Sequence, residues 1–210
     1  METINTIIQF DAKSMAYGDL TASFPYTSST GEIYLFIIYD YDTNAILAHT
    51  LKSKQAHEIK YAWLATTKRL TTHGHVIKYF VLDNECSNNL KQAIRKQNMM
   101  FLLIPPHNHR QNASERAIKT FKAHFLSTLA TCDPEYPITE WDRLIPQSEM
   151  TLNLLRLARC NPRLSAFAYI NGQHNYNKVP LVPPGTKVVI HQKPSQQNSW
   201  DFHGQMGWYV

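Results

Sequence analysis

The chain has 210 residues, of which 43% are hydrophobic and 18% charged, a composition that indicates a globular protein and excludes a disordered one. No run of about eighteen apolar residues occurs, and the first residues lack a basic start followed by an apolar segment, so neither an ordinary membrane helix nor a secretory signal is expected. The formal net charge of +5 favours an acidic partner such as nucleic acid.

Three strands in a meander are predicted at the start of the chain. β-branched and aromatic residues fill positions 32–40 and 45–51, and a turn-like segment precedes each of these runs. Residues 17–23 would form the first strand of the same meander.

Helix and strand patterns then alternate along the chain. Apolar residues recur at helical spacing from position 54 to a plausible stop at Gly74, and Ser87 can cap a short helix. Buried strands are predicted at residues 76–82 and 99–104, and a long helix starts near Ser114. This order predicts an α/β fold with a ribonuclease-H-like mixed five-stranded sheet flanked by helices.

The composition changes after Thr131. A linker-like loop is followed by predicted helices, which we expect to be interrupted at Pro146. The segment KVPLVPPGTKVVIHQKP then predicts a loop followed by a strand. The chain ends on an apolar segment typical of the middle of a strand. We therefore expect an N-terminal extension at residues 1–16, a core domain at 17–160, and a truncated C-terminal extension containing β-structure at 161–210.

Two acidic residues stand at the ends of predicted core elements. Asp83 directly follows a buried strand, and Glu115 lies in the first turn of the long helix. Asp is a common turn residue, and Glu115 could pair with Lys119 one turn further on, so a turn and a solvated ion pair would explain both acids. Alternatively, a strand-end Asp and a helix-start Glu that lie close together would bind a divalent metal ion.

A two-metal site needs a further acid from a strand beside that of Asp83. Asp19 is the preferred residue and Asp11, at another possible strand end, is the rival. Asp40 and Asp42 lie at the far end of the next strand, where turn chemistry explains them. Carboxylate oxygens are ligands suited to Mg²⁺ or Mn²⁺.

Taken in order, several segments resemble the integrase catalytic core of retroviruses and, more closely, that of copia-type long-terminal-repeat retrotransposons. The resemblance extends from about residue 17 to residue 210. It is carried by GDLTASFPYTSSTGEIYLFIIYDYD, VLDNE, PPHNHRQNASERAIKTFK, TLNLLRLARCNPRLSAFAYINGQ and PPGTKVVIHQKP.

The resemblance implies that Asp19, Asp83 and Glu115 are the metal-binding triad of a DNA strand transferase that uses Mg²⁺ or Mn²⁺. It also implies DNA as the partner, a homo-oligomer in the complete integrase, and action in the nucleus. The expected DNA-binding residues are Asn112, Arg116, Lys119 and Lys122.

Two features depart from the family pattern. Residues 84–114 separate the second and third acids, fewer than the family usually has, and the histidine–cysteine zinc module is missing. The cysteines Cys86, Cys132 and Cys160 form no disulfide framework and no C-x-x-C motif, so we expect reduced thiols in an intracellular protein and no zinc. An inactive element fragment that only binds nucleic acid, and a ribonuclease-H-like nuclease, are the alternative functions.

Overall fold

A mixed five-stranded sheet forms the centre of the computed structural model, which describes residues 13–72, 74–82, 86–103, 113–197, 199–200 and 202–210. The strand order is β3-β2-β1-β4-β5. The meander β1–β2–β3 is antiparallel, whereas β4 pairs parallel to both β1 and β5. The predicted α/β fold with a mixed sheet is confirmed.

The elements follow the predicted sequence of strands and helices. Their bounds are β1 Met15–Leu20, β2 Tyr34–Asp40, β3 Ile46–Leu51, α1 Ala56–Thr71, β4 Tyr79–Leu82, α2 Asn88–Lys96, β5 Met100–Leu103, α3 Ala113–Ala130, η2 Ile138–Leu144, α4 Ile145–Leu154, α5 Ala166–Asn171, β6 Lys187–His191, η3 Pro194–Gln196 and β7 Gly204–Trp208.

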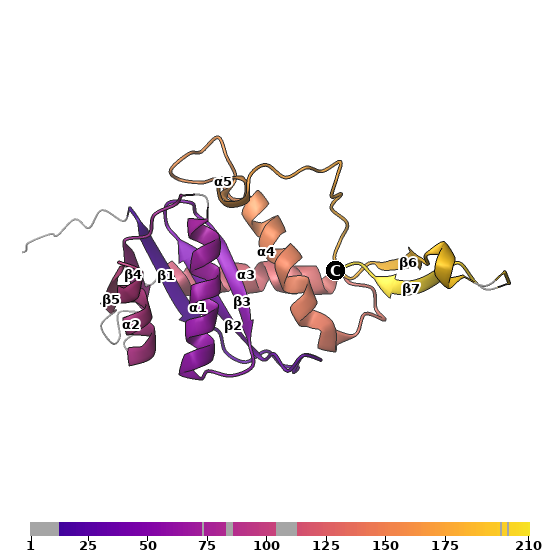
Figure 1. Ribbon diagram of the computed structural model, residues 1–210, viewed down its shortest axis with the longest axis horizontal. Helices are drawn as coiled ribbons and strands as arrows, with labels where there is room; N and C mark the ends of the chain where they lie inside the picture. Colours follow the sequence, from indigo (N-terminus) through magenta and orange to yellow (C-terminus); the bar gives the residue numbers. More distant parts are fainter. Residues whose placement is uncertain (1–12, 73, 83–85, 104–112, 198, 201) are drawn as a thin grey trace, which may run out of the picture.

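Each face of the sheet buries its own hydrophobic core. Successive side chains of β2 alternate, so that Phe36 and Ile38 join the core under α1, α2 and α5 while Ile37 and Tyr39 join the core under α3, η2 and α4. In Figure 1, α1 crosses in front of the sheet and α3 runs behind it. This two-sided burial explains why the strand is almost continuously apolar.

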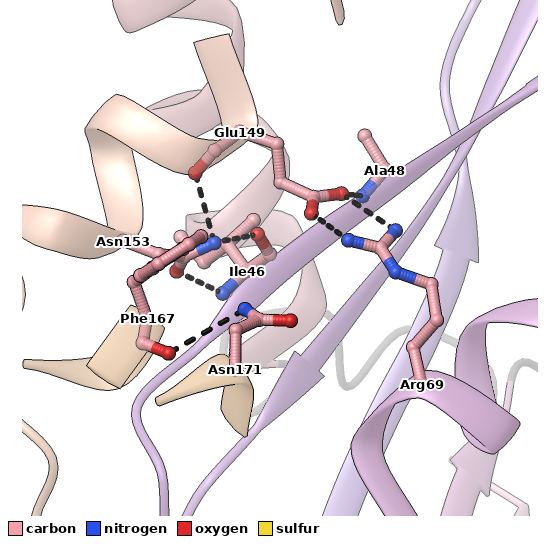
Figure 2. Close-up of polar contacts among 7 residues, drawn as sticks. All are labelled: Ile46, Ala48, Arg69, Glu149, Asn153, Phe167 and Asn171. Atoms are coloured by element: carbon pink, nitrogen blue, oxygen red, sulfur yellow. Dashed lines mark hydrogen bonds and ion pairs between the residues drawn. The ribbon is translucent and has the colours of Figure 1, made fainter. Parts of the chain in front are cut away.

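The edge strand β3 is covered by polar side chains of α4. The buried side chain of Asn153 accepts a hydrogen bond from Ile46 N–H (2.9 Å) and donates one to Ile46 C=O (2.8 Å), and Glu149 accepts one from Ala48 N–H (2.8 Å). Arg69 of α1 forms an ion pair with Glu149 (Figure 2). An uncovered edge would present unpaired backbone groups, and α4 satisfies them.

Most local expectations are confirmed, with one correction. Ser87 caps α2 by accepting a hydrogen bond from Leu90 N–H (3.3 Å), and Gly74 adopts a positive φ of 84° just after α1. The expected interruption at Pro146 is wrong. Helix η2 passes directly into α4, and Pro146 occupies the first turn of α4, where its missing N–H needs no partner.

A two-stranded hairpin, β6–β7, follows α5 and extends away from the sheet at the right of Figure 1. Its base contacts the loop after α3: Lys187 pairs with Glu135, and the Trp208 ring packs edge-on against Tyr136 at 6.1 Å between centroids. Helix α5 is part of the main core, because Ala166 and Ile170 are buried there. None of the helices in the described ranges is long and apolar enough to cross a membrane.

Candidate active site

Asp19 lies next to the end of β1, and a tight packing contact fixes its position. The preceding residue, Gly18, is buried, and a Cβ at that position would lie 2.8 Å from two atoms of the Phe80 ring. Only glycine therefore allows β1 to pack this closely on the Phe80 ring of β4. The half-buried Asp19 carboxylate accepts a hydrogen bond from Leu20 N–H (2.7 Å).

A pocket of ≈ 380 Å³ opens beside Asp19. Its lining includes Leu82, the last residue of β4, and Cys86, as well as Lys54 from the segment before α1. Asp83 lies outside the described residues, but the described residues on both sides of it, Leu82 and Cys86, line the same pocket as Asp19.

Glu115 lies in the first turn of α3, with an exposed side chain. The opposite side of the helix is buried through Ala117, Phe121 and Phe125, as the apolar spacing predicts. The helix N-terminus favours a carboxylate, because the N–H groups of a first helical turn carry partial positive charge.

The first turn of α3 lies close to β1, because its buried Ala113 and Ala117 belong to the core against which Tyr17 of β1 packs. Burial, and then the neighbouring Tyr39 and Tyr41, raise the pKa of Tyr17 in β1, whereas the positive charge of Arg116 acts in the opposite direction. Tyr17 is two residues before Asp19 and points to the same face of the strand. β1 and α3 thus meet on one face of the sheet, whereas Phe36, Ile59 and Leu90 of the Asp19 pocket belong to the core on the other face. Glu115 is not among the described residues that line that pocket.

The complete triad is not part of the described structure. Among the described residues, no group of three or more His, Cys, Asp or Glu side chains is arranged to hold a metal ion, and Asp83 is not one of those residues. Asn112 and the rival acid Asp11 also lie outside the described residues.

Asp40 and Asp42 have structural partners, as the turn interpretation predicts. The fully buried Asp40 accepts hydrogen bonds from Thr43 N–H (2.8 Å) and Thr43 O–H (2.6 Å), and its other oxygen lies 3.0 Å from the His75 Nε2. Asp42 accepts a hydrogen bond from Ser14 N–H (2.8 Å).

The cysteines are free thiols, as expected. Burial raises the pKa of the half-buried Cys86 thiol, with Lys91 acting against it, and burial also raises the pKa of Cys132. Cys86 beside the candidate pocket therefore remains protonated and is a poor nucleophile near neutral pH.

The expected DNA-binding residues of α3, Arg116, Lys119 and Lys122, are all exposed. Arg116 also lines a second pocket, together with Arg156 and Arg159 from the segment after α4. The sequence interpretation missed these two arginines. Both arginines belong to the segment TLNLLRLARCNPRLSAFAYINGQ, and nothing in that segment predicts that they lie beside α3.

No protein-family model matches the chain, and no curated protein matches it. Several solved structures do. The catalytic core domain of BIV integrase matches with a TM-score of 0.53 and 13% identity over 75% of this chain and 93% of that one. The HTLV-2 integrase catalytic core domain, solved in complex with magnesium in a trimeric form, matches with a TM-score of 0.55 and 18% identity over 75% of this chain and 95% of that one.

A longer solved chain aligns with almost the whole of this chain. In the simian T-cell lymphotropic virus intasome, solved in complex with the PP2A regulatory subunit B56 gamma, the match covers 93% of this chain and 66% of that one, with a TM-score of 0.59 and 16% identity. These likenesses show that the chain has the ribonuclease-H-like fold of retroviral integrase catalytic core domains.

Proposed function

We propose that the chain is an integrase-type catalytic domain of the copia class that carries out metal-dependent DNA strand transfer. The observation that supports this most directly is the pocket that contains Asp19, Leu82 and Cys86. Because Leu82 is the last described residue before Asp83, its place in the same pocket as Asp19 supports Asp19 and Asp83 as neighbours in the proposed triad. The fold shared with integrase cores and the net charge of +5 support the same function.

Asp19, Asp83 and Glu115 would hold Mg²⁺ or Mn²⁺. All three offer carboxylate oxygens, the donors that these hard cations prefer, and the half-buried Asp19 already lies in a pocket. When bound, a pair of such ions activates the attacking oxygen of a phosphodiester reaction and stabilises the leaving oxygen.

The chain's own residues position the substrate. Gly18 fixes β1 against β4 and so orients Asp19, and the first turn of α3 carries Glu115 on its exposed side. Lys119 and Lys122 lie one and two turns beyond Glu115 on an exposed stripe, where they would bind backbone phosphates.

The proposal is tested with Glu115→Gln and the charge-matched control Glu135→Gln. Glu135 is exposed and lies at the base of the β6–β7 hairpin, outside the proposed site. With a short DNA duplex and Mn²⁺ or Mg²⁺, the wild type and Glu135→Gln should nick or join DNA ends. Glu115→Gln should lose that activity but keep its fold and its DNA affinity, because Gln preserves size and removes only the charge.

Full activity in Glu115→Gln would contradict the metal mechanism. DNA binding without any activity in the wild type would instead support the alternative function, an inactive element fragment that only binds nucleic acid.

We also propose that the domain acts as a homo-oligomer in the nucleus. Support for the oligomer comes from the trimeric form of the HTLV-2 core and from the intasome assembly of the simian virus, whereas the nucleus follows only from DNA as the proposed partner. Light scattering of the purified chain with and without DNA tests the oligomer, and a monomer under both conditions would contradict it.

A further inference from the structure

Three arginines line a pocket of ≈ 220 Å³ on the α3 side of the sheet. Arg116 comes from the first turns of α3, and Arg156 and Arg159 come from the segment after α4. Tyr39 of β2 also lines the pocket. No carboxylate side chain lines this pocket among the described residues.

The protein holds two of these arginines rigidly. Arg156 donates from Nε to Asn44 C=O (2.7 Å) and from Nη2 to Asn44 Oδ1 (2.6 Å). Arg159 donates to Tyr41 C=O (2.7 Å) and to the Tyr39 hydroxyl, and its guanidinium lies 4.3 Å from the centroid of the Tyr41 ring. Each guanidinium has five N–H groups, so several on each remain for another acceptor.

Bringing these cations together costs free energy. Arg156 is half-buried, and burial lowers its pKa; Tyr39 acts against this, and the positive charge of Arg159 lowers it further. In the described structure, no carboxylate forms an ion pair with Arg116, Arg156 or Arg159. Arginines that are hydrogen-bonded or stacked, that repel one another and that have no acidic partner among the described residues are arranged for an external anion.

We infer that this pocket binds a phosphate group of a nucleic-acid backbone, at a position separate from the phosphodiester that reacts. The guanidinium group is planar and matches the oxygens of a phosphate with two parallel hydrogen bonds. Arg116 and Arg159 are exposed, so the pocket is open to a large ligand. Arg116 lies one helical turn from Lys119, which continues the positive charge along α3 and suits a polymer better than a single small anion.

This inference rests on the proposed function for the identity of the polymer, DNA. The test measures binding rather than catalysis. Arg116→Gln is the informative variant. Arg156 and Arg159 also hold the fold together through hydrogen bonds, whereas the Arg116 side chain forms no hydrogen bond or ion pair with the described residues. Lys96→Gln is the matched control, since it removes one exposed positive charge from α2 on the opposite side of the sheet.

Fluorescence anisotropy with a short duplex gives the affinity between roughly 50 and 200 mM salt. Arg116→Gln should bind about tenfold more weakly than the wild type, as expected for a charged hydrogen-bonding group. The slope of log affinity against log salt should fall in magnitude by about 1, as expected for the loss of one phosphate contact. Arg116→Lys should restore the salt slope but not the full affinity, because it keeps the charge and loses the paired hydrogen bonds.

Equal behaviour of Arg116→Gln and Lys96→Gln would overturn the inference and leave the proposed function intact. Weaker DNA binding by Arg116→Gln, with no strand joining by the wild type, would support the pocket and contradict the proposed catalysis. Inorganic pyrophosphate distinguishes the two sources of phosphate. If it raises the Tm of the wild type but not of Arg116→Gln, and DNA does not bind, the pocket takes a free phosphate and the nucleic-acid ligand is wrong.

Discussion

Replacing Asn153 by Leu should separate α4 from the edge of the sheet. Asn153 is 2% exposed, and its side-chain amide forms hydrogen bonds with both the N–H and the C=O of Ile46 (Figure 2). Leucine keeps the bulk of the side chain but offers neither a donor nor an acceptor. Both backbone groups of Ile46 would then be buried beneath α4 without a partner.

The magnitude follows from those two groups. A buried backbone donor or acceptor left without a partner costs about 1–3 kcal/mol, so Asn153→Leu should lower the free energy of unfolding by about 2–6 kcal/mol. In a domain of this size each kcal/mol shifts the Tm by about 2–4 °C, so a loss of about 4 kcal/mol corresponds to roughly 8–16 °C.

Thermal unfolding followed by circular dichroism measures this loss. Asn171→Leu is the matched control: Asn171 is exposed on α5 and makes one long hydrogen bond of 3.4 Å to Phe167 C=O, so its replacement should change the stability by no more than about 0.5 kcal/mol. Equal, small effects of the two substitutions would refute the reasoning, because they would mean that the β3 edge does not depend on Asn153.

Two further changes are expected to have measurable effects. Burial lowers the pKa of His75, but its hydrogen bond and charge interaction with Asp40 outweigh this and raise the pKa above 6.5. The stability that this pair contributes is therefore complete below about pH 6.5 and is lost as the pH rises through the raised pKa of His75. Urea titrations between about pH 6 and 9 should show that the free energy of unfolding of the wild type falls with pH. In His75→Gln the free energy of unfolding should change less over the same range. Gly18→Ala should lower the free energy of unfolding by about 1–3 kcal/mol, because the alanine Cβ would overlap the buried Phe80 ring. DNA joining should also fall, because the shift of β1 would displace Asp19. Unchanged activity and unchanged Tm in Gly18→Ala would contradict the packing argument.

The sheet could be predicted because its burial is reflected in local residue patterns. Alternation in β2, the Ser87 cap and the Gly74 stop are all readable from neighbours in the sequence. Pro146 shows where such reading fails. A proline interrupts the interior of a helix but is well suited to the first turn, and the sequence does not distinguish the two positions.

Asp19 could be proposed from its place at a strand end, whereas the arginine pocket could not be predicted. The hydrogen bonds from Arg156 to Asn44 join residues 112 positions apart in the chain. Another arginine of the pocket, Arg116, belongs to α3, which lies between these two residues in the sequence. No periodicity of charge within one element indicates such a cluster. It depends on how α4 docks on β3.

That dependence links the stability of α4 to the binding of DNA. Asn153 attaches the end of α4 to Ile46, and three residues later Arg156 bonds to Asn44, two residues before Ile46. The same short stretch of α4 and its following segment therefore anchors the β3 edge and places the arginine in the pocket. Loss of the first contact should loosen the second. At a temperature well below its Tm, Asn153→Leu should still be folded but should bind DNA more weakly than the wild type, with a smaller salt slope, whereas Asn171→Leu should bind normally. An unchanged affinity in Asn153→Leu, together with a lowered Tm, would contradict this link and show that the pocket does not depend on the contact between Asn153 and Ile46.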